Sequence, residues 1–318
     1  MSEAFTSISA RRPLTGLSAA AFQHPSDRQA IEALQKIRGF DYVVGKFVEY
    51  GVERVEYIRN MGGSIRVGPR QMSQLYEMLL EACKILDVEE PELYLQVGEM
   101  NAYTSGHNAP FIVLQTGVIE LMDDDEVFAV MAHELGHIKC GHVLYKAMAR
   151  MIGPFLQMLG ELTFGVGKLI GAGFEAGLLA WDRRSELSAD RAALLATQDP
   201  SPCIRMLMKL AGGNQRLASQ LDAEQFLNQS RAYREGMDEN LADRFYRFIV
   251  SRNLSHPFSV ERARALDEWA STPGYRAILE GQATFTNPLV AATCPSCGQT
   301  SSVITKFCGA CGTPLAAR

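Results

Sequence analysis

One short stretch of the chain constrains its fold and chemistry more than any other. VMAHELGHIKCGH, at positions 130–142, contains three of the six histidines. His133 and His137 are four residues apart, so on an α-helix their imidazoles lie on one face and can bind the same cation. Glu134 lies to the side, where its carboxylate can take a proton from metal-bound water without binding the metal. This HExxH arrangement predicts a catalytic zinc site with Glu134 as the general base.

The surrounding residues favour a buried helix over a surface helix that carries two histidines by chance. Residues 127–142 are strongly apolar, and unpaired polar side chains would be costly there. Acidic residues at 123–126 precede this run, as expected at a helix N-terminus, so we predict a helix from about 124 to about 149. Gly136 is unfavourable in a helix interior by about 1 kcal/mol relative to alanine, so its presence also favours a functional site over an ordinary helix.

Two other residues of the stretch are weaker ligand candidates. His142 is rotated by about 140° from His137 on an ideal helix, so we expect it behind the ligands or at the surface. Cys140 shares the histidine face but lies about 10 Å along the helix axis from His133. We interpret it as a core cysteine.

The remaining ligand is predicted in RRSELSADRAAL, at positions 183–194. Glu186 and Asp190 are four residues apart and share one helical face. Glu186 can complete a tetrahedral site whose fourth position is left to water. Asp190 can accept a hydrogen bond from the second ring nitrogen of a ligand histidine. The alternative is a pair of solvated acids beside arginines.

HELGH followed by SELSAD resembles the HtpX heat-shock protease and CAAX prenyl protease family of gluzincin endopeptidases. NAYTSG (101–106), the longer run 114–138 and SHPFSVERARAL (255–266) are similar to further family segments, so the resemblance spans roughly residues 70–270. It implies an α+β, mainly helical fold: a zincin-like metallopeptidase domain with a small sheet. It also implies that the zinc ligands are His133, His137 and Glu186.

The resemblance implies further roles for polar residues of the domain. Asp190 would lie behind the ligands, Arg262 would support the same region, and His256 would donate to the oxyanion of the tetrahedral intermediate. For His256 the alternative is a residue that leads into a helix before Pro257. His107 has no assigned role.

Two short segments are typical of strands, ELYLQV at 92–97 and FIVLQT at 111–116. The second can offer an edge to an extended peptide, which would bind through main-chain hydrogen bonds with little side-chain selectivity. The candidate substrate-strand residues are Phe111, Ile112, Val113 and Leu114.

Residues 151–181 form an apolar, glycine-rich insert. A membrane-spanning helix needs about 20 mostly uncharged residues, whereas Glu161, Lys168 and Glu175 interrupt this segment. We predict a glycine-broken helix or hairpin that packs on its own domain or another copy, or contacts a membrane surface. The chain lacks the flanking hydrophobic spans of the membrane members of the family, which puts a membrane-protein substrate in doubt.

The C-terminal region holds two CxxC pairs separated by ten residues: Cys294, Cys297, Cys308 and Cys311. Four thiolates form a closed tetrahedral site, so this pattern predicts a zinc ribbon with one structural zinc. A redox dithiol is the alternative, and two matched pairs argue against it.

We divide the chain into a flexible N-terminal lead-in (1–26), the metallopeptidase domain (27–283), a linker (284–292) and the ribbon (293–318). Asp27 is the expected N-cap of a helical run that ends at Gly62-Gly63. The net charge of −5 gives no electrostatic argument for a nucleic-acid partner. Clustered cysteines and the lack of a secretory signal favour the cytoplasm, with peripheral membrane contact as an option.

The leading hypothesis is a zinc-dependent metalloendopeptidase that hydrolyses peptide bonds of protein or peptide substrates, with protein quality control as a candidate role. It would carry one catalytic and one structural zinc. The alternative is a latent or inactive zincin that acts as a binding or adaptor module through its ribbon and its apolar insert. The presence of Glu134 argues against that alternative, because loss of the base is the simplest route to inactivity.

Overall fold

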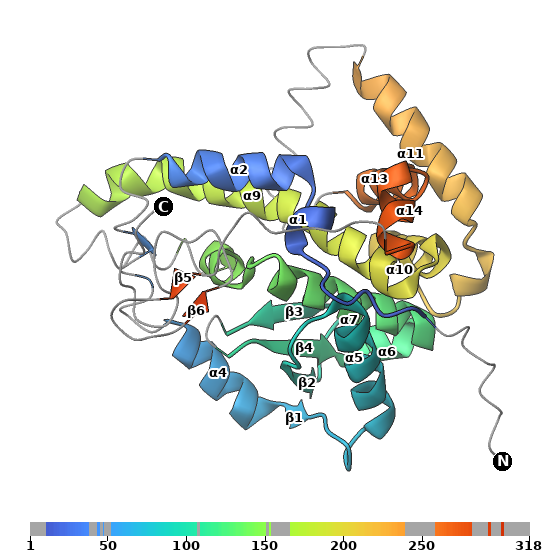
Figure 1. Ribbon diagram of the computed structural model, residues 1–318, viewed down its shortest axis with the longest axis horizontal. Helices are drawn as coiled ribbons and strands as arrows, with labels where there is room; N and C mark the ends of the chain where they lie inside the picture. Colours follow the sequence, from blue (N-terminus) through green and yellow to red (C-terminus); the bar gives the residue numbers. More distant parts are fainter. Residues whose placement is uncertain are drawn as a thin grey trace.

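The computed structural model describes residues 11–37, 43–44, 47, 52–106, 109–150, 153, 166–238, 258–281, 292–293 and 300–301 (Figure 1). This part of the chain is mainly helical and contains a small mixed sheet, so the expected α+β fold is confirmed. The labelled helices are α1 (Ala19–Phe22), α2 (Pro25–Gln35), α4 (Val52–Gly63), α5 (Ser73–Leu86), α6 (Thr116–Leu121), α7 (Asp124–Lys139), α9 (Val166–Thr197), α10 (Pro200–Gly212), α11 (Ala223–Asp238), α13 (Ser259–Ala270) and α14 (Pro273–Leu279). A short 3-10 helix, η1, spans Ala218–Gln220.

The larger sheet has the strand order β1-β2-β4-β3. Its strands are β1 (Ile65–Arg66), β2 (Glu92–Gln96), β3 (Ala102–Ser105) and β4 (Phe111–Gln115). β4 pairs in parallel with β2 on one side and antiparallel with β3 on the other. The expectation that Phe111, Ile112, Val113 and Leu114 form an edge for substrate is therefore wrong. Among the strands that the structure describes, β4 is interior and β3 lies at the edge, and the side chains of these four β4 residues are fully buried.

Helix α7 carries the HExxH motif, and its start follows from local sequence. The Asp123 carboxylate accepts the Glu126 amide hydrogen, while the Glu126 carboxylate accepts that of Asp123, which is a complete capping box. The helix ends at Lys139, and Gly141 then adopts a left-handed backbone with φ of 70°. The expected single helix to about 149 is corrected to α7 and a second helical stretch at 143–150. This break turns His142 back toward α7, because its direction no longer follows the helical repeat.

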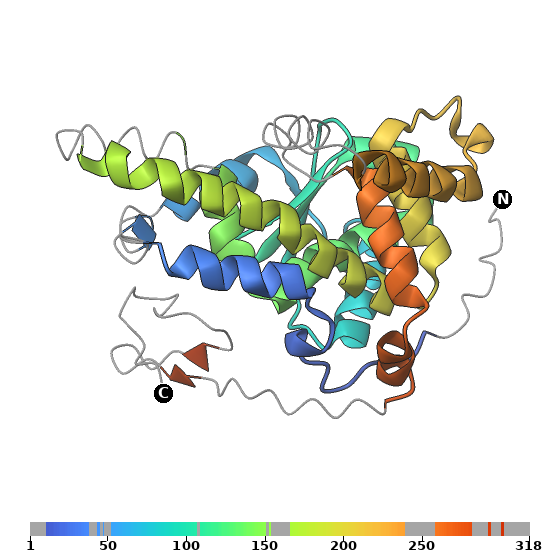
Figure 2. The same cartoon turned by 90° about the horizontal axis from the view of Figure 1, so that it is seen from above.

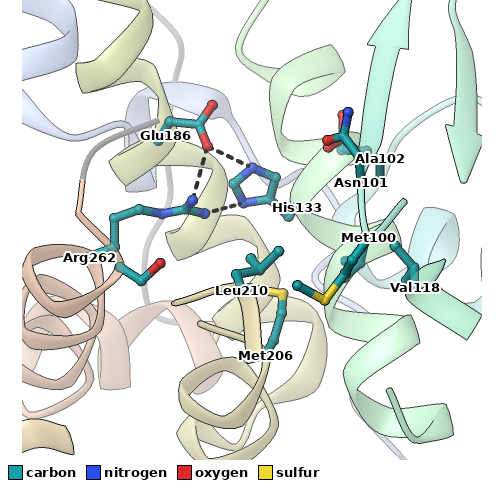
Figure 3. Close-up of a pocket in the computed structure, with 12 residues that line it drawn as sticks. Met100, Asn101, Ala102, Val118, His133, Glu186, Met206, Leu210 and Arg262 are labelled. Carbon is teal, nitrogen blue, oxygen red and sulfur yellow. Dashed lines mark hydrogen bonds and ion pairs between the residues drawn. The ribbon is translucent and has the colours of Figure 1, made fainter. Parts of the chain in front are cut away.

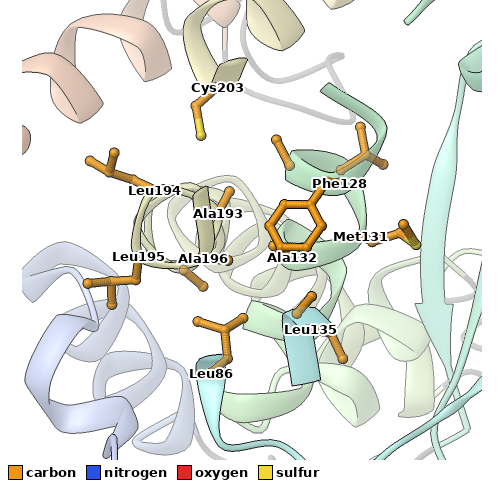
Figure 4. Close-up of a cluster of buried hydrophobic side chains, with 14 of the residues drawn as sticks. Leu86, Phe128, Met131, Ala132, Leu135, Ala193, Leu194, Leu195, Ala196 and Cys203 are labelled. Carbon is orange, nitrogen blue, oxygen red and sulfur yellow. The ribbon is translucent and has the colours of Figure 1, made fainter. Parts of the chain in front are cut away.

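Helices α7 and α9 cross in close contact at the centre of the domain (Figure 4). A Cβ atom at Gly136 would lie 2.6 Å from the Ala192 Cβ and 3.0 Å from the Ala189 Cα. Any larger residue would therefore push the two helices apart. The glycine that is unfavourable for helix propensity is required by packing, and it brings the metal-ligand face of α7 within reach of α9.

Helix α9 is one continuous helix from Val166 to Thr197. The prediction of a glycine-broken helix or hairpin over 151–181 is wrong for residues 166–181, which belong to the same helix as Glu186. Residues 151–152 and 154–165 lie outside the described residues. Within the described part of the chain, no helix is both long enough and apolar enough to cross a membrane.

The N-terminal region is packed against the domain in the residues that the structure describes. Leu14, Leu17 and Phe22 are buried in the main core, so the predicted flexible lead-in is corrected for residues 11–26. α2 lies along α9, as both views show (Figures 1 and 2). The N-cap of α2 is His24, whose side chain accepts the Ser26 amide hydrogen. Asp27, the expected N-cap, instead lies inside the first turn and is fully buried.

At the other end of the chain, β5 (Ala292–Thr293) and β6 (Thr300–Ser301) pair antiparallel. The four cysteines of the CxxC pairs lie outside the described residues, as does most of the linker. The zinc ribbon therefore stays a prediction.

Candidate active site

The structure brings His133 and His137 of α7 together with Glu186 of α9. One donor atom from each lies within 4.8 Å of the other two. The Nε2 atom of His133 is 3.4 Å from Oε2 of Glu186, and that of His137 is 3.3 Å from Oε1. All three side chains are buried. The residues proposed from sequence spacing thus meet at one point.

The donor set fits a tetrahedral zinc ion. For zinc–nitrogen and zinc–oxygen bonds of about 2.1 Å, the ligand atoms of a tetrahedral site lie about 3.4 Å apart. Each histidine Nε2 lies close to that spacing from one carboxylate oxygen of Glu186, His133 from Oε2 and His137 from Oε1. Two imidazoles and one carboxylate are also a known protein ligand set of catalytic zinc sites, with one position left open.

Glu134 borders the same site but is not a member of the three-donor group. Its side chain is buried, and its Oε2 accepts a hydrogen bond of 2.7 Å from the Thr104 hydroxyl of the edge strand β3. Thr104 therefore holds the carboxylate beside the donor group without neutralising it. The sequence contains no signal for this contact, since it depends on how β3 packs on α7.

A buried acid and a buried arginine support His133 from behind. Asp190 Oδ1 lies 3.0 Å from His133 Nδ1, so the ring can donate to it and present Nε2 to a metal. Arg262 donates to both oxygens of Asp190, at 2.8 and 2.6 Å, and its Nη1 lies 3.3 Å from Glu186 (Figure 3). These contacts place Asp190 and Arg262 where the sequence predicted them, directly behind the ligands.

These charges set the protonation states. Burial alone would raise the pKa of Asp190, but the Arg262 guanidinium outweighs burial and lowers it. Burial would lower the pKa of His133, but Asp190 and Glu186 outweigh burial and raise it to about 9. The neighbouring carboxylates thus favour a positive charge at His133, either a proton or a metal ion in its place. Burial and the Lys146 ammonium hold the pKa of His137 well below its usual value, so that ring stays neutral and able to bind metal.

A second chain of contacts supports His137. Its Nδ1 lies 3.0 Å from Nδ1 of His142, whose Nε2 lies 3.0 Å from the Asp27 carboxylate. Asp27 also accepts hydrogen bonds from Trp181 Nε1 at 2.9 Å and from the Ser188 hydroxyl at 2.6 Å. With Asp27 ionised, each ring can donate toward it, which leaves Nε2 of His137 free of hydrogen for a metal. Burial alone would raise the pKa of Asp27, but contacts led by His142 lower it, consistent with the ionised form.

Lys146 is a further buried charge that the sequence did not indicate. Its ammonium lies 2.5 Å from Glu186 Oε1 and 3.0 Å from Asp182. Burial would lower the pKa of Lys146, but the two carboxylates outweigh burial and raise it. A charged Lys146 can hold the Glu186 carboxylate in its orientation. The helical stretch 143–150 brings Lys146 to Glu186 only because α7 ends at Lys139. A single continuous helix, as expected from the sequence, does not predict this contact.

A pocket of about 200 Å³ opens beside this group (Figure 3). One wall is polar and is formed by His133, Glu134, Glu186 and Arg262. The facing wall is largely apolar and comes from β3 and the residues just before it, and from α6, α7 and α10. Its residues are Met100, Ala102, Val118, Val130, Met206 and Leu210. The arrangement combines a metal-binding group, a carboxylate base and space for an apolar side chain.

Other residues predicted from the sequence lie elsewhere. His256, the candidate oxyanion donor, and His107 lie outside the described residues. Cys140 is buried, caps α7 and does not belong to the donor group, as expected. The residues that sequence reasoning did not assign to the site are Thr104, Lys146 and Asp27.

Replacing Asp27 by asparagine is expected to weaken zinc binding about tenfold, the lower end of the range for residues that orient metal ligands. An amide cannot hold the His142–His137 chain in one hydrogen-bonding direction as a carboxylate does. Chelator competition on purified protein would measure the change. Asp199→Asn, at the N-cap of α10 and away from the site, is the matched control. Equal zinc affinity in wild type and Asp27→Asn would show that Asp27 only stabilises the fold.

Comparisons with known proteins agree with this geometry. The pattern of peptidase family M48 matches residues 69–270. The chain is 39% identical over 269 residues to the plastoglobule-localized metallopeptidase 48 of Arabidopsis thaliana, a match that covers 83% of this chain and 76% of the relative. It is 26% identical to an HtpX protease homologue of a Sulfurihydrogenibium species, over 68% of this chain and 81% of the relative. It is 25% identical to the HtpX protease of Xylella fastidiosa, over 76% and 89%.

No solved structure matches the chain. The family match covers α5 to α13, which includes every described residue of the donor group and the pocket. The residues that the structure gathers are thus the ones that the family pattern spans. The chain belongs to peptidase family M48 and is a metallopeptidase related to the HtpX proteases.

Proposed function

We propose that the protein is a zinc-dependent endopeptidase that cleaves extended segments of peptide or protein substrates. The observation that carries this is the meeting of His133, His137 and Glu186 next to Glu134, at a pocket that adjoins an edge strand. The experiment that tests it is cleavage profiling of a proteome-derived peptide mixture by the wild-type and Glu134→Gln proteins.

Each buried polar residue has a separate part in the proposed reaction. When bound, zinc supplies Lewis acidity to the attacking water and to the scissile carbonyl. Glu134 takes a proton from that water and later delivers it to the leaving amine. Asp190 and His142 hold the two histidines in the tautomer that binds metal, and Lys146 and Arg262 hold Glu186. His256 stays the proposed donor to the oxyanion.

The edge strand β3 is the proposed docking site for the substrate backbone. The Gln115 amide donates to the Asn101 carbonyl, which makes 101 and 115 a hydrogen-bonded pair of the antiparallel ladder. The polar backbone groups of Ala102 and Thr104 therefore point away from β4. Among the described residues no strand pairs with that side of β3. The Thr104 carbonyl already accepts a hydrogen bond of 3.0 Å from Arg150. An extended peptide can therefore pair with β3 at Ala102, beside Glu134.

The apolar wall of the pocket supports a preference for an apolar substrate side chain. Met100, Val118, Val130, Met206 and Leu210 would surround a side chain that points from the bound peptide toward α7. Burial of such a side chain stabilises the complex in proportion to the apolar area removed from water.

Metal analysis would test the two proposed zinc sites together. Mass spectrometry of the purified full chain should find two zinc ions per chain, and one after the paired change Cys294→Ser and Cys297→Ser. The four thiolates would form a closed structural site that is independent of the histidine group. Glu134→Gln is the control that should keep both ions. A single ion in the wild type, or two ions in the cysteine variant, would contradict the ribbon proposal.

The location and biological role of the protein are further parts of the proposal. The clustered cysteines support the proposed cytoplasmic location. The name of the Arabidopsis relative places that protein at plastoglobules, and this supports peripheral contact with a lipid surface. Residues 151–181 stay the proposed contact, except Leu178 and Trp181, which are buried. The HtpX relatives are proteases by name, and protein quality control is the proposed role. No electrostatic argument favours a nucleic-acid partner, because the net charge is −5.

A further inference from the structure

We propose that a second pocket, on the other face of β3, is a substrate subsite that accepts an acidic side chain of the bound peptide. The inference rests on the proposed function, because it requires a peptide at the β3 edge. This second pocket has a volume of about 420 Å³. It is lined by Arg59, Gln96, Asn101, Tyr103, Gln115 and Arg150, and is called the arginine pocket below.

The strand register places the arginine pocket on the face of the sheet away from the metal group. Side chains alternate along β3, so Thr104, which contacts Glu134, points to the α7 face, and Tyr103 points to the opposite face. The Tyr103 hydroxyl donates to Asn60 of α4 at 3.0 Å, which confirms the side. Gln96 pairs with Gln115 across the sheet, and Gln115 pairs with Asn101. Three amide side chains thus form a row across β2, β4 and the start of β3.

The two pockets adjoin at the edge strand. Asn101 lines both of them. Arg150 donates to the Thr104 carbonyl at 3.0 Å, and its guanidinium lies 5.4 Å from the centre of the Tyr103 ring. The Thr104 carbonyl points away from β4, at the free edge of β3, and Arg150 already occupies it. A peptide can therefore not pair with β3 at Thr104. A bound peptide therefore pairs at Ala102 and leaves the edge at Arg150.

The charge of the arginine pocket selects the kind of side chain. The six described residues that line it include two guanidinium groups and no carboxylate. Guanidinium groups bind carboxylates in a planar, two-point geometry, and the amide groups offer further donors. Arg59 is exposed on α4, so it stays accessible to a ligand from solvent.

A peptide strand bound at β3 would present its side chains alternately to the two pockets. Positions that face α7 meet the apolar wall, and positions that face α4 meet the arginine pocket. The expected substrate therefore has an apolar residue beside the scissile bond and an acidic residue directly next to that apolar residue. The ligand class is a carboxylate on an extended peptide.

Paired peptides that differ only in Glu or Lys at the position next to the apolar residue would test this. The wild type should cleave the Glu peptide about fivefold faster in kcat/KM, the scale of a partly exposed ion pair. Arg59→Glu should remove or invert that preference, and Arg59→Lys should keep it. Arg54→Glu is the matched control, since it makes the same charge change on α4 outside the pocket.

Binding of the same peptides to the Glu134→Gln variant separates this inference from the proposed function. Fluorescence anisotropy should show the same preference for Glu without any cleavage. Equal binding of the two peptides, or an equal effect of Arg54→Glu and Arg59→Glu, would overturn the subsite. A preference in binding combined with cleavage that does not depend on Glu134 would overturn the proposed mechanism and leave the subsite standing.

Discussion

Glu134→Gln is expected to lower kcat/KM for peptide cleavage by about 10²- to 10⁴-fold, the usual contribution of a general base. Glutamine has the same shape and can still accept the hydrogen bond from Thr104, but it cannot take a proton from the attacking water. Glu134 lies outside the group of three metal donors. Zinc content and thermal stability are therefore expected to stay close to wild type.

The control for this variant is Glu120→Gln, an exposed change on α6 that should leave cleavage unaffected. Cleavage that is equal in the wild type and Glu134→Gln would mean that another group is the base, or that a contaminating protease is measured. If neither protein cleaves any peptide while both bind peptides, the latent or adaptor alternative is favoured. Metal analysis of the same samples excludes loss of zinc as the cause.

Asp190→Ala is expected to lower the free energy of unfolding by about 3–5 kcal/mol, the cost of leaving a buried charge without its partner. Arg262 is 4% exposed and makes two hydrogen bonds of 2.8 and 2.6 Å to Asp190. Without that carboxylate, the guanidinium loses both of these hydrogen bonds and keeps its 3.3 Å contact with Glu186. Urea denaturation of the full chain, followed by circular dichroism, would measure the change.

A double variant separates the pair from the individual residues. In Asp190→Ala with Arg262→Met, both buried charges are removed, so a large part of the lost stability should return. Zinc affinity should not return, because His133 still lacks the acceptor that sets its tautomer. If the double variant is as unstable as the sum of the single variants, the ion pair is not the source of the effect. The matched surface change is Asp267→Asn on α13, where no loss is expected.

The parts of the fold that were predicted correctly have strong local signals. Acidic residues at 123–126 mark the start of α7 because a capping box needs only neighbouring residues. The strands β2 and β4 were found from their apolar patterns. Glu186 and Asp190 were found because four-residue spacing places two side chains on one helical face, whatever the rest of the fold does.

The wrong predictions concern contacts between segments that are distant in sequence. Nothing in FIVLQT shows that β3 covers its free side, because strand order depends on the pairing of whole segments. Aspartate is a common N-cap residue, which is why Asp27 was expected to cap α2. Its burial is explained only by its hydrogen bonds with Trp181 and Ser188 of α9. The break after Lys139 was missed because glycine has the same low helix propensity at 136 and 141. Only the structure shows that Gly136 is required where α7 meets α9, whereas Gly141 takes a left-handed backbone just after the helix ends.

The sequence alone determined the chemistry of this protein: two histidines, a base and a distant carboxylate in one spacing pattern that is typical of a metallopeptidase. Those residues act through local helix geometry, which short-range spacing specifies. The tertiary structure decided what surrounds them. It placed Thr104 against Glu134, Asp27 behind His142, and Lys146 and Arg262 against Glu186. These contacts join side chains that are distant in sequence. They exist only because β3 and α9 pack on α7, while α2 and α13 pack on α9.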